Sequence, residues 1–119
     1  MELDVRLQIL KDAGQISENT FEALKRVIGM FGSKWGIMLT EENGAMLITH
    51  LSVALERIKK GEIIEGIDSE IYSEIKNHNE FNKSAQIIKD IIEVSNIEIP
   101  ESEETFIAMH ICTLLQGNK

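Results

Sequence analysis

Apolar residues recur along this chain at intervals of three and four positions, and runs that alternate strictly between apolar and polar residues are scarce. Because a helix turns about once every 3.6 residues, this spacing gathers apolar side chains on one face and is typical of amphipathic helices. The eight glycines fall mostly at the edges of the apolar segments. The pattern therefore predicts an all-helical chain whose short connections favour antiparallel neighbours.

Capping and stop residues divide this pattern into a short lead-in helix and five further helices. Ser, Thr and Asp side chains accept hydrogen bonds from the unpaired N–H groups of a first turn, and Gly commonly follows a last turn. The predicted elements are a helix over residues 3–11, a second that begins after Ser17, a third from Thr40 to about Lys60, a fourth that begins at Asp68, a fifth over residues 80–94 and a last helix from Pro100 to Gly117.

Apolar spacing also predicts which side chains face the core. In the first helix we expect Val5, Ile9 and Leu10 to share the buried face. In the fifth helix the core candidates are Phe81, Ile88, Ile91 and Ile92.

The composition narrows the classes of function. The chain has 119 residues, the size of one domain, and a formal net charge of −8 at pH 7. Nucleic-acid binding draws most of its affinity from Lys and Arg, so we expect no direct contact with nucleic acid or with an anionic membrane. The single cysteine, Cys112, excludes an internal disulfide, and the N-terminal residues lack the features of a signal peptide. We therefore expect a cytoplasmic protein.

Two histidines, His50 and His110, lie within strongly apolar predicted helices. Seven residues make almost two helical turns, so residues i and i+7 point nearly the same way. Arg57 follows His50 by seven positions, and Glu103 precedes His110 by seven. If the two helices pack antiparallel with the histidines level, Arg57 comes opposite Glu103.

The residue pattern alone is compatible with more than one role for these histidines. A histidine at the edge of an apolar stripe is usually a polar residue with a structural role. A metal site would need both histidines, Cys112 and a carboxylate to converge, but His110 and Cys112 face opposite sides of one helix. Cys112 lies in an apolar stretch without a neighbouring base, as a buried core thiol does. We therefore predict no metal, no cofactor and no enzymatic activity.

Two segments resemble the paired histidine motifs of the PTS-regulation domain (PRD) family. One has a His–Leu pair, an arginine seven positions later and then a glycine. The other has a proline, a glutamate seven positions before its histidine, an aromatic residue and a small residue. These residues are His50, Leu51, Arg57 and Gly61 in the first segment, and Pro100, Glu103, Phe106, Ala108 and His110 in the second. The resemblance covers about residues 16–116 as a single stand-alone copy.

The resemblance implies an all-α fold, a five-helix bundle of the PRD type with a short extra N-terminal helix. It divides the chain into a lead-in helix over residues 1–15 and a PRD over residues 16–119. The family includes transcriptional antiterminators, and its bundle dimerises, so a homodimer is implied. Its histidines accept phosphoryl groups from the sugar phosphotransferase system, whose histidine phosphocarrier protein or permease B component is the donor.

Carried over to this chain, the resemblance implies that His50 and His110 are phosphoacceptors and that Arg57 and Glu103 support the phosphorylation site. The expected function is that of a phosphohistidine regulatory domain, which modulates transcription or a partner protein through dimerisation or interaction. The alternative is a helical dimerisation or adaptor module that keeps the fold of the family and is not phosphorylated.

Overall fold

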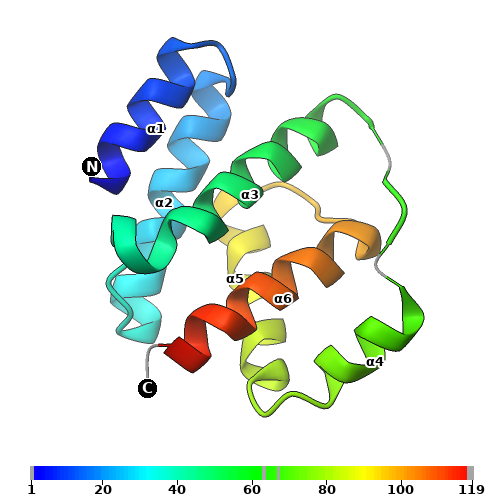
Figure 1. The fold of residues 1–119 in the computed structure, drawn as a ribbon. Coiled ribbons are helices and arrows are strands. Elements are labelled where there is room, and N and C mark those ends of the chain that lie inside the picture. The colour runs from blue at the N-terminus through cyan, green and yellow to red at the C-terminus, as the bar shows by residue number, and fades with distance from the viewer. Residues whose placement is uncertain (1, 63, 67, 118–119) are drawn as a thin grey trace.

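Two long helices, α3 (Glu41–Lys59) and α6 (Glu101–Gly117), run side by side in opposite directions across the front of the molecule (Figure 1). The computed structural model describes residues 2–62, 64–66 and 68–117, which contain six helices and no strand. The predictions of an all-helical chain and of antiparallel neighbours are therefore confirmed.

The start of α3 is fixed by a reciprocal cap. The Thr40 hydroxyl accepts a hydrogen bond from the Asn43 backbone N–H, and the Asn43 side chain accepts one from the Thr40 N–H. At the other end the chain turns through Gly61, whose φ of +74° lies in the left-handed region that favours glycine. Both boundaries agree with those predicted from Thr40 and Gly61.

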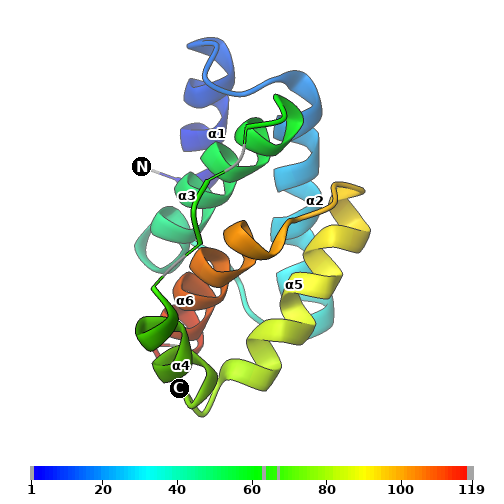
Figure 2. The ribbon, with the colours of Figure 1, turned by 90° about the vertical axis from the view of Figure 1, so that its right-hand side faces the viewer.

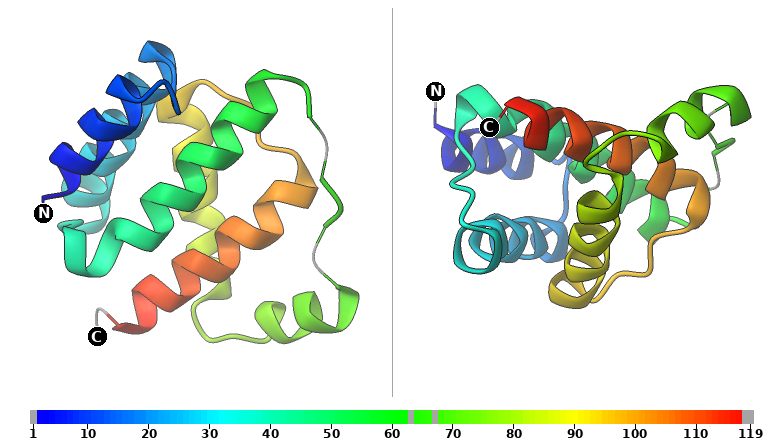
Figure 3. Two further views of the ribbon diagram at one scale, coloured as in Figure 1. Left: turned by 45° about the horizontal axis from the view of Figure 1, so that its top comes forward. Right: turned by 90° about the horizontal axis from the view of Figure 1, so that it is seen from below.

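A second antiparallel pair, α2 (Glu18–Trp35) and α5 (Phe81–Ser95), packs behind the first. The view from below in Figure 3 shows the two layers, with α3 and α6 in one and α2 and α5 in the other. Ser17 caps α2 as predicted, because its side chain accepts a hydrogen bond from the Thr20 N–H. The two layers enclose the hydrophobic core between them.

The first helix, α1 (Leu3–Asp12), packs against α2 and α3. The prediction that Val5 and Ile9 face the core is wrong, because their side chains are 47% and 49% exposed. Two apolar stripes compete in this short helix, and the leucine stripe, with spacings of four and three, is the one that packs. Its members are Leu3 and Leu7, which are buried, and Leu10, which is partly buried. A side-chain pair between Arg6 and Glu41 of α3 holds the helix in this rotation.

The shortest helix, α4 (Ser69–Lys76), lies at the opposite end of the molecule from α1 (Figure 2). It begins as predicted at Asp68, whose carboxylate accepts a hydrogen bond from the Glu70 N–H. None of its residues is buried, and it packs against α6. α4 therefore adds little to the core.

Helix α5 buries a stripe of isoleucines. Ile88 and Ile91 are buried as predicted, and Ile87 is fully buried. Phe81 and Ile92 are only partly buried, so their prediction as core residues is only partly right. Phe81 occupies the first turn, where its ring meets that of Tyr72 edge-on, with 6.3 Å between centroids.

A polar joint links the end of α2 to α5. The carboxylate of Asp90 is buried, and it accepts hydrogen bonds from the Trp35 indole N–H at 2.9 Å and from the Lys34 ammonium at 2.7 Å. Because the buried charge has both a cation and a hydrogen-bond donor, its burial is compensated. Within the described residues, no helix has the length and apolar character needed to cross a membrane.

Candidate functional site: a paired-histidine cleft

The imidazole rings of His50 and His110 stack on each other. Their centroids are 4.1 Å apart, and their planes are inclined by 25°. His50 comes from α3 and is exposed, whereas His110 comes from α6 and is half-buried. The antiparallel packing of α3 and α6 thus joins two residues that lie far apart in the sequence.

An ion pair lies beside the rings. Arg57 donates two parallel hydrogen bonds to Glu103, from Nε to Oε2 at 3.0 Å and from Nη2 to Oε1 at 2.9 Å. The Glu103 side chain is 2% exposed, and that of Arg57 is 32% exposed. The pairing inferred from the seven-residue spacing is confirmed. The hydrogen bond to Glu103 raises the pKa of Arg57 above its ordinary value, so the guanidinium stays charged.

The rings and the ion pair line one open cleft of about 620 Å³. Its walls are His50, Ala54 and Arg57 of α3, Glu103, Phe106, Ile107, Met109 and His110 of α6, and Ile64 and Glu65 of the connection between α3 and α4. Arg57 is the one lysine or arginine among these residues. Sequence analysis missed Ile64 and Glu65, because the connecting segment that holds them carries no periodic signal that could have revealed them.

The environment of His110 favours its neutral form. Burial, followed by the influence of the neighbouring His50, lowers the pKa of His110 below its ordinary value. A neutral imidazole has one nitrogen lone pair free to attack an electrophile. The cleft therefore presents a nucleophile that does not have to lose a proton first at neutral pH.

A family model described as the PRD domain matches residues 25–113. This chain belongs to the PRD domain family. PRD domains are regulatory rather than catalytic. The matched range of this PRD contains both stacked histidines and both members of the ion pair.

Two relatives of this PRD match over nearly its whole length. YhfY of Escherichia coli K12, an uncharacterised protein, is 24% identical over 109 residues, which cover 92% of this chain and 91% of the relative. An uncharacterised protein of Haemophilus influenzae Rd is 23% identical over 119 residues, which cover 100% of this chain and 95% of the relative. No solved structure matches the chain.

A second, smaller hollow of about 420 Å³ also has His110 of the PRD in its lining. It is lined by Glu42, Asn43, Met46, Leu47, His110, Thr113, Leu114 and Gly117. None of these residues is a lysine or an arginine. His110 therefore lines two hollows, and Arg57 is the one lysine or arginine among the described residues of both.

The third histidine of the PRD, His78, lies outside the cleft. It sits in the turn between α4 and α5, where its Nδ1 accepts a hydrogen bond from the Glu80 N–H at 3.0 Å. Its Nε2 lies 3.2 Å from Oε1 of Gln116. Both nitrogens thus have partners within the fold, and His78 has a structural role.

The cysteine of the PRD is a buried thiol, as the apolar stretch around it predicted. Burial raises the pKa of Cys112, although a hydrogen bond with Ser84 opposes the change. Nowhere in the described part of the chain do three or more His, Cys, Asp or Glu side chains gather as a metal site requires.

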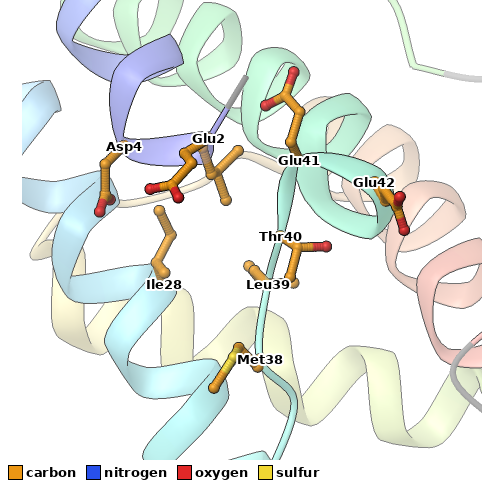
Figure 4. A pocket seen from close by; sticks show the side chains of 9 residues that line it. Glu2, Asp4, Ile28, Met38, Leu39, Thr40, Glu41 and Glu42 are labelled. Carbon is orange, nitrogen blue, oxygen red and sulfur yellow. The ribbon is translucent and has the colours of Figure 1, made fainter.

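A separate groove of about 530 Å³ lies at the beginnings of α1 and α3 (Figure 4). We call it the acidic groove, and it is lined by Glu2, Leu3, Asp4, Ile28, Met38, Leu39, Thr40, Glu41 and Glu42. Glu2 and Asp4 lie on one side of the groove and Glu41 and Glu42 on the other, with Ile28 and Leu39 below them in this view. It contains no histidine, so it offers acids and apolar side chains but no nucleophile of the kind in the cleft.

Proposed function

We propose that this PRD is a phosphohistidine switch that receives phosphoryl groups from the sugar phosphotransferase system at His50 and His110. The donor is the histidine phosphocarrier protein or a permease B component. The proposal is supported most directly by the two stacked imidazoles at the mouth of an open cleft, beside an arginine–carboxylate pair. Arg57 and Glu103 are the supporting residues, because their pairing fixes the register of α3 against α6 next to the rings.

The transfer needs little catalysis from the acceptor. The lone pair of a neutral imidazole nitrogen attacks phosphorus, a new P–N bond forms, and the P–N bond of the donor's phosphohistidine breaks. The electron pair of the broken bond returns to the donor's ring, which takes up a proton, while the acceptor ring releases one. Because one phosphohistidine replaces another, the step is close to balanced, and correct positioning is the main requirement.

The modified cleft differs from the free one mainly in charge. A phosphoryl group adds about two negative charges near pH 7. Phe106, Ile107 and Met109 form an apolar wall beside the rings, and charge next to such a wall disfavours apolar contacts with another surface. Phosphorylation would thereby change the packing of a partner or of a second copy on this face, and through it modulate transcription or a partner protein.

The finer architecture is part of the same proposal. Helices α2 to α6 form the five-helix bundle of the PRD type over residues 16–119, and α1 is the extra lead-in helix within residues 1–15. The PRD acts in the cytoplasm as a homodimer and makes no direct contact with nucleic acid.

The test is phosphotransfer from a reconstituted system of phosphoenolpyruvate, the first enzyme of the phosphotransferase system and the histidine phosphocarrier. Intact-mass spectrometry at neutral to alkaline pH, which preserves phosphohistidine, measures the label. We expect label on the wild type, on His50→Ala and on His110→Ala, and none on the double variant. His78→Ala is the matched control, because it removes a histidine outside the cleft, and it should label like the wild type.

Two results would contradict the proposal. One is label that persists on the double variant. The other is a wild-type protein that stays unlabelled in a reaction whose carrier is itself phosphorylated. If light scattering also shows that this protein is a dimer, its function would be that of the unphosphorylated adaptor module.

A further inference from the structure

Among the described residues of the cleft, a phosphoryl group would find no cation that is not already paired. It brings about two negative charges to the mouth of a partly apolar pocket, and such a charge is stable there only if cations or hydrogen-bond donors compensate it. Arg57 is the one lysine or arginine that lines the cleft. Its charge is already neutralised by Glu103, which is 2% exposed and bonded to it twice. The pair therefore contributes N–H groups but no net positive charge.

The other charged residues that line these two hollows are acids. Glu65, on the connection after α3, lines the same cleft, and Glu42 of α3 lines the second hollow that includes His110. No lysine is among the described residues that line either hollow. A dianion placed on either ring therefore adds to acids that are already present.

The second imidazole is the group that can make up the deficit. The rings are stacked with 4.1 Å between centroids, so a phosphoryl group bonded to one ring nitrogen lies within a few ångströms of the other ring. Opposite charge at that range strongly favours the protonated form of an imidazole. The unmodified ring of the pair is therefore held as a cation after the transfer.

Protonation also removes the reactive lone pair. An imidazolium carries hydrogen on both nitrogens, so neither nitrogen can attack a second phosphorus atom. Repulsion between two dianions on rings in contact opposes a second transfer as well. The two effects act in the same direction.

We propose that His50 and His110 are alternative acceptors of a single phosphoryl group, and that whichever ring is left unmodified takes up a proton from solvent and holds the group as its counter-ion. This inference rests on the proposed function for its donor, but it concerns the pair of rings and not the source of the phosphoryl group. The switch then has two states, free and singly phosphorylated, although it carries two acceptors.

The experiment uses potassium phosphoramidate, a small-molecule donor that phosphorylates histidine directly, so that failure of the carrier protein to dock does not affect it. The full chain is labelled to completion, and intact-mass spectrometry counts phosphoryl groups in the wild type and in the His78→Gln control, which removes the histidine outside the cleft. We expect one phosphoryl group per chain, divided between His50 and His110. A doubly labelled fraction equal to the product of the two single-site occupancies would overturn the inference, and so would absence of label on both histidines.

Charge rescue separates a counter-ion from a packing role. With His110→Gln, the phosphoryl group on His50 should hydrolyse at least about tenfold faster than in the wild type, which is the effect of one pKa unit of differential interaction. With His110→Lys, which restores a cation in place of the ring, the lifetime should return toward the wild-type value. The reciprocal pair, His50→Gln and His50→Lys, reports on a group held by His110. Equal lifetimes in the Gln and Lys variants would overturn the inference.

Nuclear magnetic resonance supplies a readout that a merely structural histidine would not change. In the singly labelled protein, the unmodified ring of the pair should titrate at least one pH unit higher than it does in the free protein. The ring resonances of His78, whose nitrogens are bonded to Glu80 and Gln116, should be unchanged by labelling. An unmodified ring whose titration does not move would contradict the inference, whereas label from phosphoramidate without label from the carrier would contradict only the proposed function.

Discussion

The histidine cleft and the acidic groove are two hollows of similar size that serve different chemistry. Their volumes are about 620 Å³ and 530 Å³, and both have α3 in their walls. Each also lies beside an arginine–carboxylate pair between two helices: Arg57 with Glu103 at the cleft, and Arg6 with Glu41 at the groove. Size and an ion pair are therefore not what distinguishes the candidate site.

Burial and the neighbours of the ion pair are what differ. The Glu103 side chain is 2% exposed, whereas that of Glu41 is 22% exposed. The Arg57–Glu103 pair lies beside two imidazoles, whereas Glu41 of the other pair lines the groove together with the acids Glu2, Asp4 and Glu42 (Figure 4). A buried pair fixes two helices against each other, and here it fixes the helices that carry the nucleophiles.

The largest expected difference is in stability. Arg57→Ala should lower the free energy of unfolding by about 3 kcal/mol, because it leaves the Glu103 carboxylate buried without its cation. That value is at the low end for buried pairs, since the Arg57 side chain is 32% exposed. Arg6→Ala should have a much smaller effect, because water screens exposed pairs. Urea denaturation of the two variants checks the comparison, and equal losses would contradict it.

A change at the groove should affect stability without affecting the switch. Thr40→Ala removes the hydroxyl that accepts the Asn43 N–H and should cost about 1 kcal/mol of the free energy of unfolding. Phosphotransfer to the histidines should stay at the wild-type rate, because Thr40 lies at the opposite end of α3 from Arg57. Thr40→Ser keeps the hydroxyl and is the control. A Thr40→Ala protein that folds but labels slowly would show that the two hollows are coupled.

The smallest expected difference between the two regions is in how each affects the pH dependence of the free energy of unfolding. Burial, and to a lesser extent the neighbouring His50, lowers the pKa of His110 in the folded protein. At a pH below the ordinary pKa of histidine, the unfolded chain therefore binds more protons than the folded one. The free energy of unfolding should thus rise with pH through about 5 to 7, where unperturbed histidine titrates, and His110→Gln should flatten this rise. At the groove the hydrogen bond with Arg6 lowers the pKa of Glu41, whose contribution is lost only at more acidic pH. Urea titrations of both proteins across this range measure the difference; parallel curves would contradict it.

Local sequence signals were enough to place most of the helix boundaries. The caps at Ser17, Thr40 and Asp68 each form the backbone hydrogen bond that their residue type predicts. The caps depend only on neighbours within one turn of helix. The pairing of Arg57 with Glu103 needed a further assumption, because helical periodicity relates each residue to its histidine but only the antiparallel packing of α3 and α6 brings the two charges together.

Features that depend on packing between distant segments were less predictable. The prediction that Val5 and Ile9 are on the buried face of α1 was wrong. That helix has two apolar stripes of similar strength, and packing against α2 and α3 determines which of them is buried. The presence of Glu65 in the cleft follows from the course of the connection after α3, which no periodicity describes. The roles of His50 and His110 as phosphoacceptors stay a prediction.

The joint of Trp35 with Asp90 gives the protein a built-in optical reporter. Trp35 is the single tryptophan of the chain, and its indole N–H is held by a buried carboxylate between α2 and α5, in the layer behind the histidines. Its fluorescence emission should therefore change when those two helices separate and should not change when the histidines are phosphorylated. Fluorescence of the unlabelled protein can thus follow unfolding while resonances of the two rings follow the switch, each in the same sample.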